Sequence, residues 1–188
     1  VTPVSDQLNG DYCWAFSTIA VLESCIAKAT GLQYDFSENN LINLNKKYSS
    51  YGLNVTGQAG NAINALGYLL SWLGPVNEND DAYEVDSKIS PVLNSLMHVQ
   101  NVLFLDMKYD DSDRNSIKEA IMRYGAVGTS IYWMQLYPLQ NSSSYYHFSD
   151  EPALANHAIT LVGWDDNYSK DNFGLTPPGD GAWICKKS

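Results

Sequence analysis

The stretch DQLNGDYCWAFST, residues 6–18, decides the expected fold, because it places a cysteine immediately before a run of apolar residues. Apolar side chains recur at helical spacing from Phe16 to Ala27, and Gly31 is a typical C-terminal residue, so we expect a helix that begins near Cys13. The partial positive charge at a helix N-terminus stabilises a thiolate. A buried structural thiol is the commoner explanation for an isolated cysteine, so on this evidence Cys13 is only a candidate nucleophile.

The remaining elements divide the chain into two different halves. Periodicity, caps and turn residues predict helices over 37–44, 62–73 and 115–124, and strands over 98–105, 127–133, 157–164 and 182–186. The first half is therefore mostly helical and the second mainly β. We expect one α+β domain over 1–188 with a helical lobe at about 1–90, a β lobe at about 91–188 and a cleft between them.

Composition excludes several classes of function. The 188 residues are 45% hydrophobic and 17% charged, as in a globular protein, and contain no apolar run long enough to span a membrane. A formal net charge of -10 disfavours a nucleic-acid partner. Three cysteines without a CxxC pair indicate neither a disulfide framework nor a zinc site. Cys25 and Cys185 are expected in the core, with a bridge between them left open, and the acidic turn at 165–171 lacks the spacing of a calcium loop.

A cysteine nucleophile needs a base, and histidine is the usual one. The chain offers three histidines, of which His157 opens the apolar run HAITLVG, where a strand would hold the imidazole rigidly. It lies downstream of Cys13 at a distance within the roughly 130–150 residues that separate cysteine and histidine in cysteine proteases of the papain kind. We expect His98 and His147 to lie outside the chemistry.

Several motifs together resemble those of papain-like (C1-type) cysteine peptidases. VTPVSDQLNGDYCWAFS resembles the segment around the family's nucleophile, and the segments that resemble its later motifs are FSENNLIN, YGAVGTSI, NHAITLVGW and GAWICKKS. These motifs follow the family's order across nearly the whole chain. The resemblance implies a papain-like two-lobe fold, with an antiparallel β-barrel-like second lobe, and peptide-bond hydrolysis without metal or cofactor.

The resemblance also implies roles for individual residues. Cys13 corresponds to the nucleophile, His157 to the general acid/base, and Gln7 to the side-chain donor of the oxyanion hole. The resemblance also implies substrate-binding residues. Gly60 would hold an extended peptide through its backbone, and the main specificity pocket would be lined by Ala62, Ser130 and Ala158. Two others, Trp14 and Asn156, would lie beside the site.

One position departs from the family pattern. Where the family has an asparagine that orients the histidine, this chain has Lys187, whose side chain has donors but no acceptor and whose charge disfavours an imidazolium. A catalytically weak or inactive homologue, acting as a peptide-binding or structural module, therefore remains an alternative. A third interpretation is a Cys–His hydrolase that acts on amides other than proteins.

The surroundings of the chain are also expectations from the resemblance. The motif GPVNENDDAY resembles prokaryotic surface-associated members that carry a lectin-like domain. We therefore expect a protein or peptide substrate, an extracellular or cell-surface location, and a propeptide or lectin-like domain outside this chain. The chain is expected to be trimmed at both ends.

Overall fold

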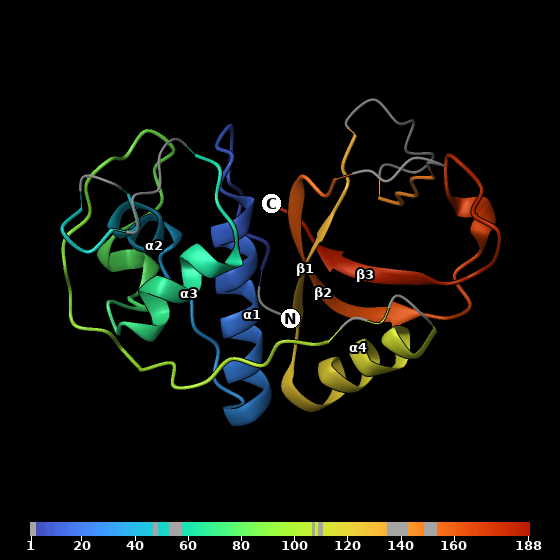
Figure 1. Ribbon diagram of the computed structural model, residues 1–188, viewed down its shortest axis with the longest axis horizontal. Coiled ribbons are helices and arrows are strands. Elements are labelled where there is room, and N and C mark those ends of the chain that lie inside the picture. Colours follow the sequence, from blue (N-terminus) through green and yellow to red (C-terminus); the bar gives the residue numbers. More distant parts are fainter. Residues whose placement is uncertain are drawn as a thin grey trace.

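Helix α1 (Cys13–Thr30) lies between a helical lobe and a lobe that contains the sheet (Figure 1). The computed structural model describes residues 3–46, 49–52, 58–106, 108, 111–134, 143–148 and 154–188. The predicted helix is confirmed at both ends. It starts at Cys13, and it ends where Gly31 adopts a left-handed backbone (φ 76°) and donates its N–H to Ala27 O at 2.9 Å.

Two shorter helices pack against α1 in the helical lobe (Figure 1). Helix α2 (Glu38–Leu44) begins at Ser37, whose side chain accepts the Asn40 N–H at 2.9 Å, as the predicted cap requires. Helix α3 (Ala62–Leu70) begins at a capping box formed by Asn61 and Asn64. It ends three residues before the predicted Leu73, because Trp72 turns into the left-handed region (φ 62°) and breaks the helix.

A long segment without regular structure joins the two lobes. After the short 3-10 helix η1 (Glu78–Asp80), the chain crosses the lower half of α1 in this view to reach α4, as the yellow-green trace shows (Figure 1). The strand predicted over 98–105 is wrong: these residues pair with no strand in the described part of the chain, and Leu103 and Phe104 are exposed. The apolar residues suggested a strand, but a strand also needs a neighbour to complete its hydrogen bonds, which a pattern along the chain does not reveal.

The second lobe consists of one helix and an antiparallel sheet. Helix α4 (Asp111–Tyr124) begins four residues before the predicted start, and its first turn contains Asp111 and Asp113, where negative charge is favourable. The sheet has the order β1 (Val127–Ile131), β2 (His157–Asp165) and β3 (Ala182–Lys186). A short 3-10 helix, η2 (Lys170–Asn172), lies between β2 and β3 along the chain. The other three predicted strands are confirmed, with β1 ending two residues before its predicted end.

The arrangement confirms the expected two-lobe α+β fold. Within the described residues the sheet is open rather than closed into a barrel. One cluster of buried side chains fills the helical lobe around α1, and a smaller one lies between α4 and the sheet. The boundaries of about 1–90 and 91–188 for the two lobes stay a prediction. Because α1 and β2 lie side by side, the first residues of these two elements come close together.

Candidate active site

The structure places Cys13 against the beginning of β2. The thiol is half-buried in the first turn of α1, and its Sγ accepts a hydrogen bond of 3.3 Å from the Ala158 N–H. Ala158 directly follows His157, so residues far apart in sequence meet at this point. A helix N-terminus and a strand N–H both favour negative charge on the sulfur.

His157 is the first residue of β2 and lies opposite Ile131 of β1. It is half-buried, its ring centroid is 6.1 Å from that of Trp133, and its Nε2 atom is buried without a hydrogen-bond partner in the described part of the chain. Burial lowers the pKa of His157, and the positive charge of Lys187 lowers this pKa further. The imidazole is therefore held in a fixed strand position but in surroundings that favour its neutral form.

Lys187 lies beside the same aromatic ring as His157. Its Nζ is 4.8 Å from the centroid of the Trp133 ring and donates a hydrogen bond of 3.3 Å to Ser188 O. The lysine charge thus lies over the Trp133 ring, and the His157 imidazole lies beside the same ring. The charge of Lys187 thus lowers the pKa of His157, and no acceptor for Nε2 is found among the described residues.

Gln7 has both ends of its side-chain amide engaged. Its Oε1 accepts the Tyr12 N–H at 3.1 Å, immediately before Cys13, and its Nε2 donates to Ser188 O at 3.2 Å. Oε1 is bound to the backbone at the start of α1 and one NH₂ hydrogen is directed at Ser188 O, and an amide NH₂ has a second hydrogen with which it can donate. This arrangement ties Gln7 to the same helix N-terminus that carries the thiol.

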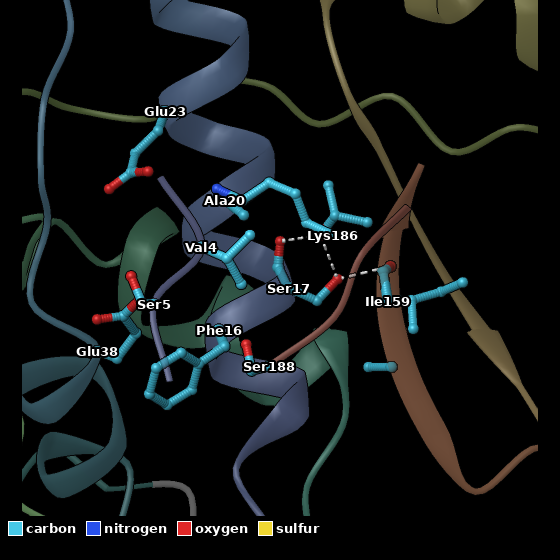
Figure 2. A pocket seen from close by; sticks show the side chains of 12 residues that line it. Val4, Ser5, Phe16, Ser17, Ala20, Glu23, Glu38, Ile159, Lys186 and Ser188 are labelled. Atoms are coloured by element: carbon cyan, nitrogen blue, oxygen red, sulfur yellow. Dashed lines mark hydrogen bonds between the residues drawn. The ribbon is translucent and has the colours of Figure 1, made fainter. Parts of the chain in front are cut away.

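Three hydroxyl contacts join α1 to β2 one turn below Cys13. Ser17 Oγ donates to Ile159 O at 2.9 Å, and Thr160 Oγ1 lies 3.1 Å from Ser17 Oγ and 3.2 Å from Ser17 O. Figure 2 shows Ser17 on α1 facing Ile159 on β2 beside a small cavity. Because Thr160 is only 1% exposed, these bonds are shielded from water and fix the distance between the two elements.

The predicted substrate-binding residues fall into two groups. Ser130 and Ala158 face each other across β1 and β2, close to Cys13. Gly60 is exposed above Trp14, and a Cβ at Gly60 would lie 2.5 Å from the indole ring. Ala62 follows as the exposed first residue of α3.

Two of the six have side chains occupied by structural contacts. Trp14 is 2% exposed and its Nε1 donates to Gln58 O at 3.0 Å, which places it under the surface. The Asn156 side chain accepts the Trp133 N–H at 2.7 Å and donates to Trp133 O at 3.1 Å. Asn156 therefore shapes the loop before His157.

An acidic cluster lies next to the site, between the residue 5–8 segment and α2; Glu23 and Glu38 are buried in it, Glu78 is half-buried and Asp35 is exposed. Glu38 is 4% exposed and lines a cavity of about 310 Å³ together with Asp35 and Glu78, and it also borders the cavity in Figure 2, where Glu23 and Lys186 lie. Burial raises the pKa of Glu38 to about 8, its own backbone N–H lowers this pKa, and the negative charges of Glu78, Glu23 and Asp35 raise it. This cluster was missed from the sequence, because its members are dispersed along the chain.

The other candidate residues lie apart from Cys13 and His157. His98 stacks on Trp72 with ring centroids 4.3 Å apart, and His147 contacts Tyr132 at 4.7 Å. All three cysteines are free thiols, and burial raises the pKa of Cys25. Among the described residues there is no cluster of three side chains suited to a metal ion, and no helix has the length and apolar character needed to cross a membrane.

Comparison with known proteins identifies the family. A model described as "Papain family cysteine protease" matches residues 1–188. This chain belongs to the papain family of cysteine proteases. Papain-family relatives include pro-cathepsin H of Mus musculus, 26% identical over 193 residues, and cysteine proteinase 15A of Pisum sativum, 30% identical over 194 residues. Both alignments cover 100% of this chain but 52% and 51% of the relatives, so the chain spans about half their length.

A papain-family structure of bacterial origin is also similar. It contains the cysteine protease and lectin-like domains of Cwp84, a surface layer associated protein of Clostridium difficile. The match covers 100% of this chain and 42% of the other, with 31% identity and a TM-score of 0.87. The expected family resemblance is thereby confirmed, including its likeness to a surface-associated member with a lectin-like domain.

Proposed function

We propose that this papain-family chain is a cysteine-type peptidase that hydrolyses peptide bonds through a covalent acyl-enzyme. The observation that carries the proposal is the hydrogen bond of 3.3 Å from the Ala158 N–H to Cys13 Sγ. It joins the helix N-terminus that stabilises a thiolate to the strand whose first residue is His157. Nucleophile and base are thus carried by two elements that are themselves fastened together.

The reaction assigns one task to each group. His157 takes the proton of the Cys13 thiol, and the thiolate attacks the substrate carbonyl carbon. The π electron pair of that carbonyl moves onto its oxygen, which the Gln7 Nε2 amide and the Cys13 N–H stabilise. His157 then gives its proton to the leaving amine as the C–N bond breaks. In the second half, His157 takes a proton from water, hydroxide attacks the thioester, and the thiolate leaves to restore the enzyme.

The substrate is proposed to be an extended segment of protein or peptide. Gly60 is exposed and lacks a side chain, so an approaching backbone can come close to it. Ser130 and Ala158, small residues facing each other on adjacent strands, leave room for a substrate side chain next to the thiol, with Ala62 on the opposite lobe. We further propose an extracellular or cell-surface location, and a propeptide and lectin-like domain outside this chain, from the likeness to Cwp84.

The proposal is tested by labelling the folded protein with a peptide vinyl sulfone from about pH 4 to about pH 9. Mass spectrometry then identifies the modified residue. We expect modification of Cys13 well below the pKa of about 8.5 for a free thiol, its loss in His157→Ala, and no change in the matched control Cys25→Ser. Hydrolysis of a fluorogenic peptide should follow the same pattern.

The same experiment distinguishes the alternatives. Reaction of Cys13 only at alkaline pH would contradict a working thiolate–imidazolium pair and leave a papain-like peptide-binding module. Two observations give this alternative weight: the buried His157 Nε2 has no hydrogen-bond partner within the described residues, and the charge of Lys187 lowers the pKa of His157. Rapid labelling with hydrolysis of small amides but not of peptides would instead point to an amidase.

A further inference from the structure

Tyr83, in the segment after η1, joins the helical lobe to the residue 6–11 loop. Its hydroxyl donates a hydrogen bond of 2.9 Å to Gln7 O, across 76 residues of sequence. Its own N–H donates to Glu78 Oε1 at 2.7 Å. Its ring meets Phe16 of α1 edge-on, with centroids 4.9 Å apart and an interplanar angle of 89°. Tyr83 is thus held by its backbone and by its ring while its hydroxyl reaches Gln7.

The loop that Tyr83 contacts has little freedom to move. Gln7 O also accepts the Gly10 N–H at 3.0 Å, and Leu8 between them adopts a left-handed backbone (φ 53°). A Cβ at Gly10 would lie 2.6 Å from the Tyr12 ring and 2.7 Å from the Tyr83 hydroxyl oxygen. The absence of a side chain at Gly10 therefore lets the tyrosine approach the loop.

The two ends of Gln7 are consequently fixed by different partners. The backbone carbonyl is held by Tyr83 and Gly10, while the side-chain Oε1 is held by the Tyr12 N–H at 3.1 Å. Together with the bond of 3.2 Å from Nε2 to Ser188 O, these bonds determine where Nε2 lies and in which direction its hydrogens point. An oxyanion donor acts only if it is in place before charge develops.

We propose that Tyr83 is a positioning residue, which holds the Gln7 backbone so that the Gln7 amide is preorganised to stabilise the oxyanion. The inference rests on the proposed peptidase function for its catalytic consequence. The contact is direct, from the Tyr83 hydroxyl to the main chain of the donor residue, and Tyr83 itself does not touch the reacting atoms.

The surroundings of Tyr83 keep its hydroxyl available as a donor. Burial raises the pKa of Tyr83, and the charges of Tyr12, Glu38 and Asp6 raise it further. The phenol therefore keeps its proton at every pH at which the protein would work. The hydrogen bond to Gln7 O does not depend on a titration.

The variant Tyr83→Phe removes the hydroxyl and leaves the ring contacts with Phe16 and Tyr12 in place. Removing an oxyanion donor altogether lowers the rate by about 10²- to 10³-fold, so displacing one should lower kcat by about tenfold. KM should stay unchanged, because the affected bond strengthens only in the transition state. The matched control is Tyr34→Phe, which removes a hydroxyl from a tyrosine stacked on Phe36 in the same lobe.

Two measurements decide the inference, and one of them needs no turnover. NMR relaxation of the Gln7 side-chain NH₂ should show a lower order parameter in Tyr83→Phe but not in Tyr34→Phe. In kinetics, Gln7→Ala/Tyr83→Phe should be no slower than Gln7→Ala, because the tyrosine acts through the glutamine. An unchanged Gln7 order parameter would overturn the inference, as would additive losses of kcat. A chain without peptidase activity refutes the proposed function, while the order parameter still decides whether Tyr83 positions Gln7.

Discussion

Replacing Glu38 by glutamine should make the protein more stable at alkaline pH and leave its stability at pH 5 nearly unchanged. Glu38 is 4% exposed, and burial followed by its neighbours raises its pKa from an ordinary 4.5 to about 8. Between these two values the folded chain keeps a proton that the unfolded chain has lost. The free energy of unfolding therefore falls as the pH rises through this window, and the whole loss is present above about pH 8.

The size of the effect follows from the two pKa values. A rise from 4.5 to about 8 corresponds to about 5 kcal/mol, at about 1.4 kcal/mol for each pH unit. Glu78, Glu23 and Asp35 repel the charge on Glu38, whereas Lys186 attracts it. Burial lowers the pKa of Lys186, and the charges of Glu23 and Glu38 offset part of this lowering. Glu78 lies in the same cluster and its pKa is also raised, so the two carboxyl groups share the effect. We therefore expect Glu38→Gln to increase the free energy of unfolding by about 3 kcal/mol at pH 9.

Urea denaturation at pH 5 and pH 9 measures this difference directly. The matched control is Glu119→Gln on the exposed face of α4, which should change the free energy of unfolding by less than about 0.5 kcal/mol at either pH. If Glu38→Gln has the same effect at both pH values, or destabilises at pH 9, then Glu38 is ionised in the folded protein and the reasoning is refuted.

Two further predictions concern Lys187 and Gly60. Lys187→Met removes a positive charge and should raise the pKa of His157 measured by NMR titration, and Lys187→Gln, which adds an acceptor, should raise it at least as far. A His157 pKa unaffected by Lys187→Met would show that burial alone lowers it. Gly60→Ala should lower the free energy of unfolding by about 1–3 kcal/mol, because its Cβ would lie 2.5 Å from the Trp14 ring, which is anchored to Gln58 O. Urea denaturation checks this, and an unchanged midpoint would mean that the indole moves aside freely.

Local signals in the sequence were sufficient where one residue controls its own neighbourhood. Ser37 caps α2 as predicted, Gly31 ends α1 as predicted, and the run from His157 forms β2. Each of these signals acts through backbone hydrogen bonds within a few residues, or through an apolar pattern that one element can express by itself. Where pairing with another segment was required, as over 98–105, the pattern alone was misleading.

The sequence by itself determined the candidate chemistry: a thiol at a helix N-terminus, a histidine at the start of a strand, and an amide a few residues before the thiol. The tertiary structure alone decided how these groups are held. The Ser17 contacts fasten α1 to β2, the Tyr83 hydroxyl holds Gln7, and Glu38 lines cavities that Ser17 and Tyr83 also line. These interactions join segments far apart along the chain, and their strength depends on burial and distance, which exist only after the lobes have packed.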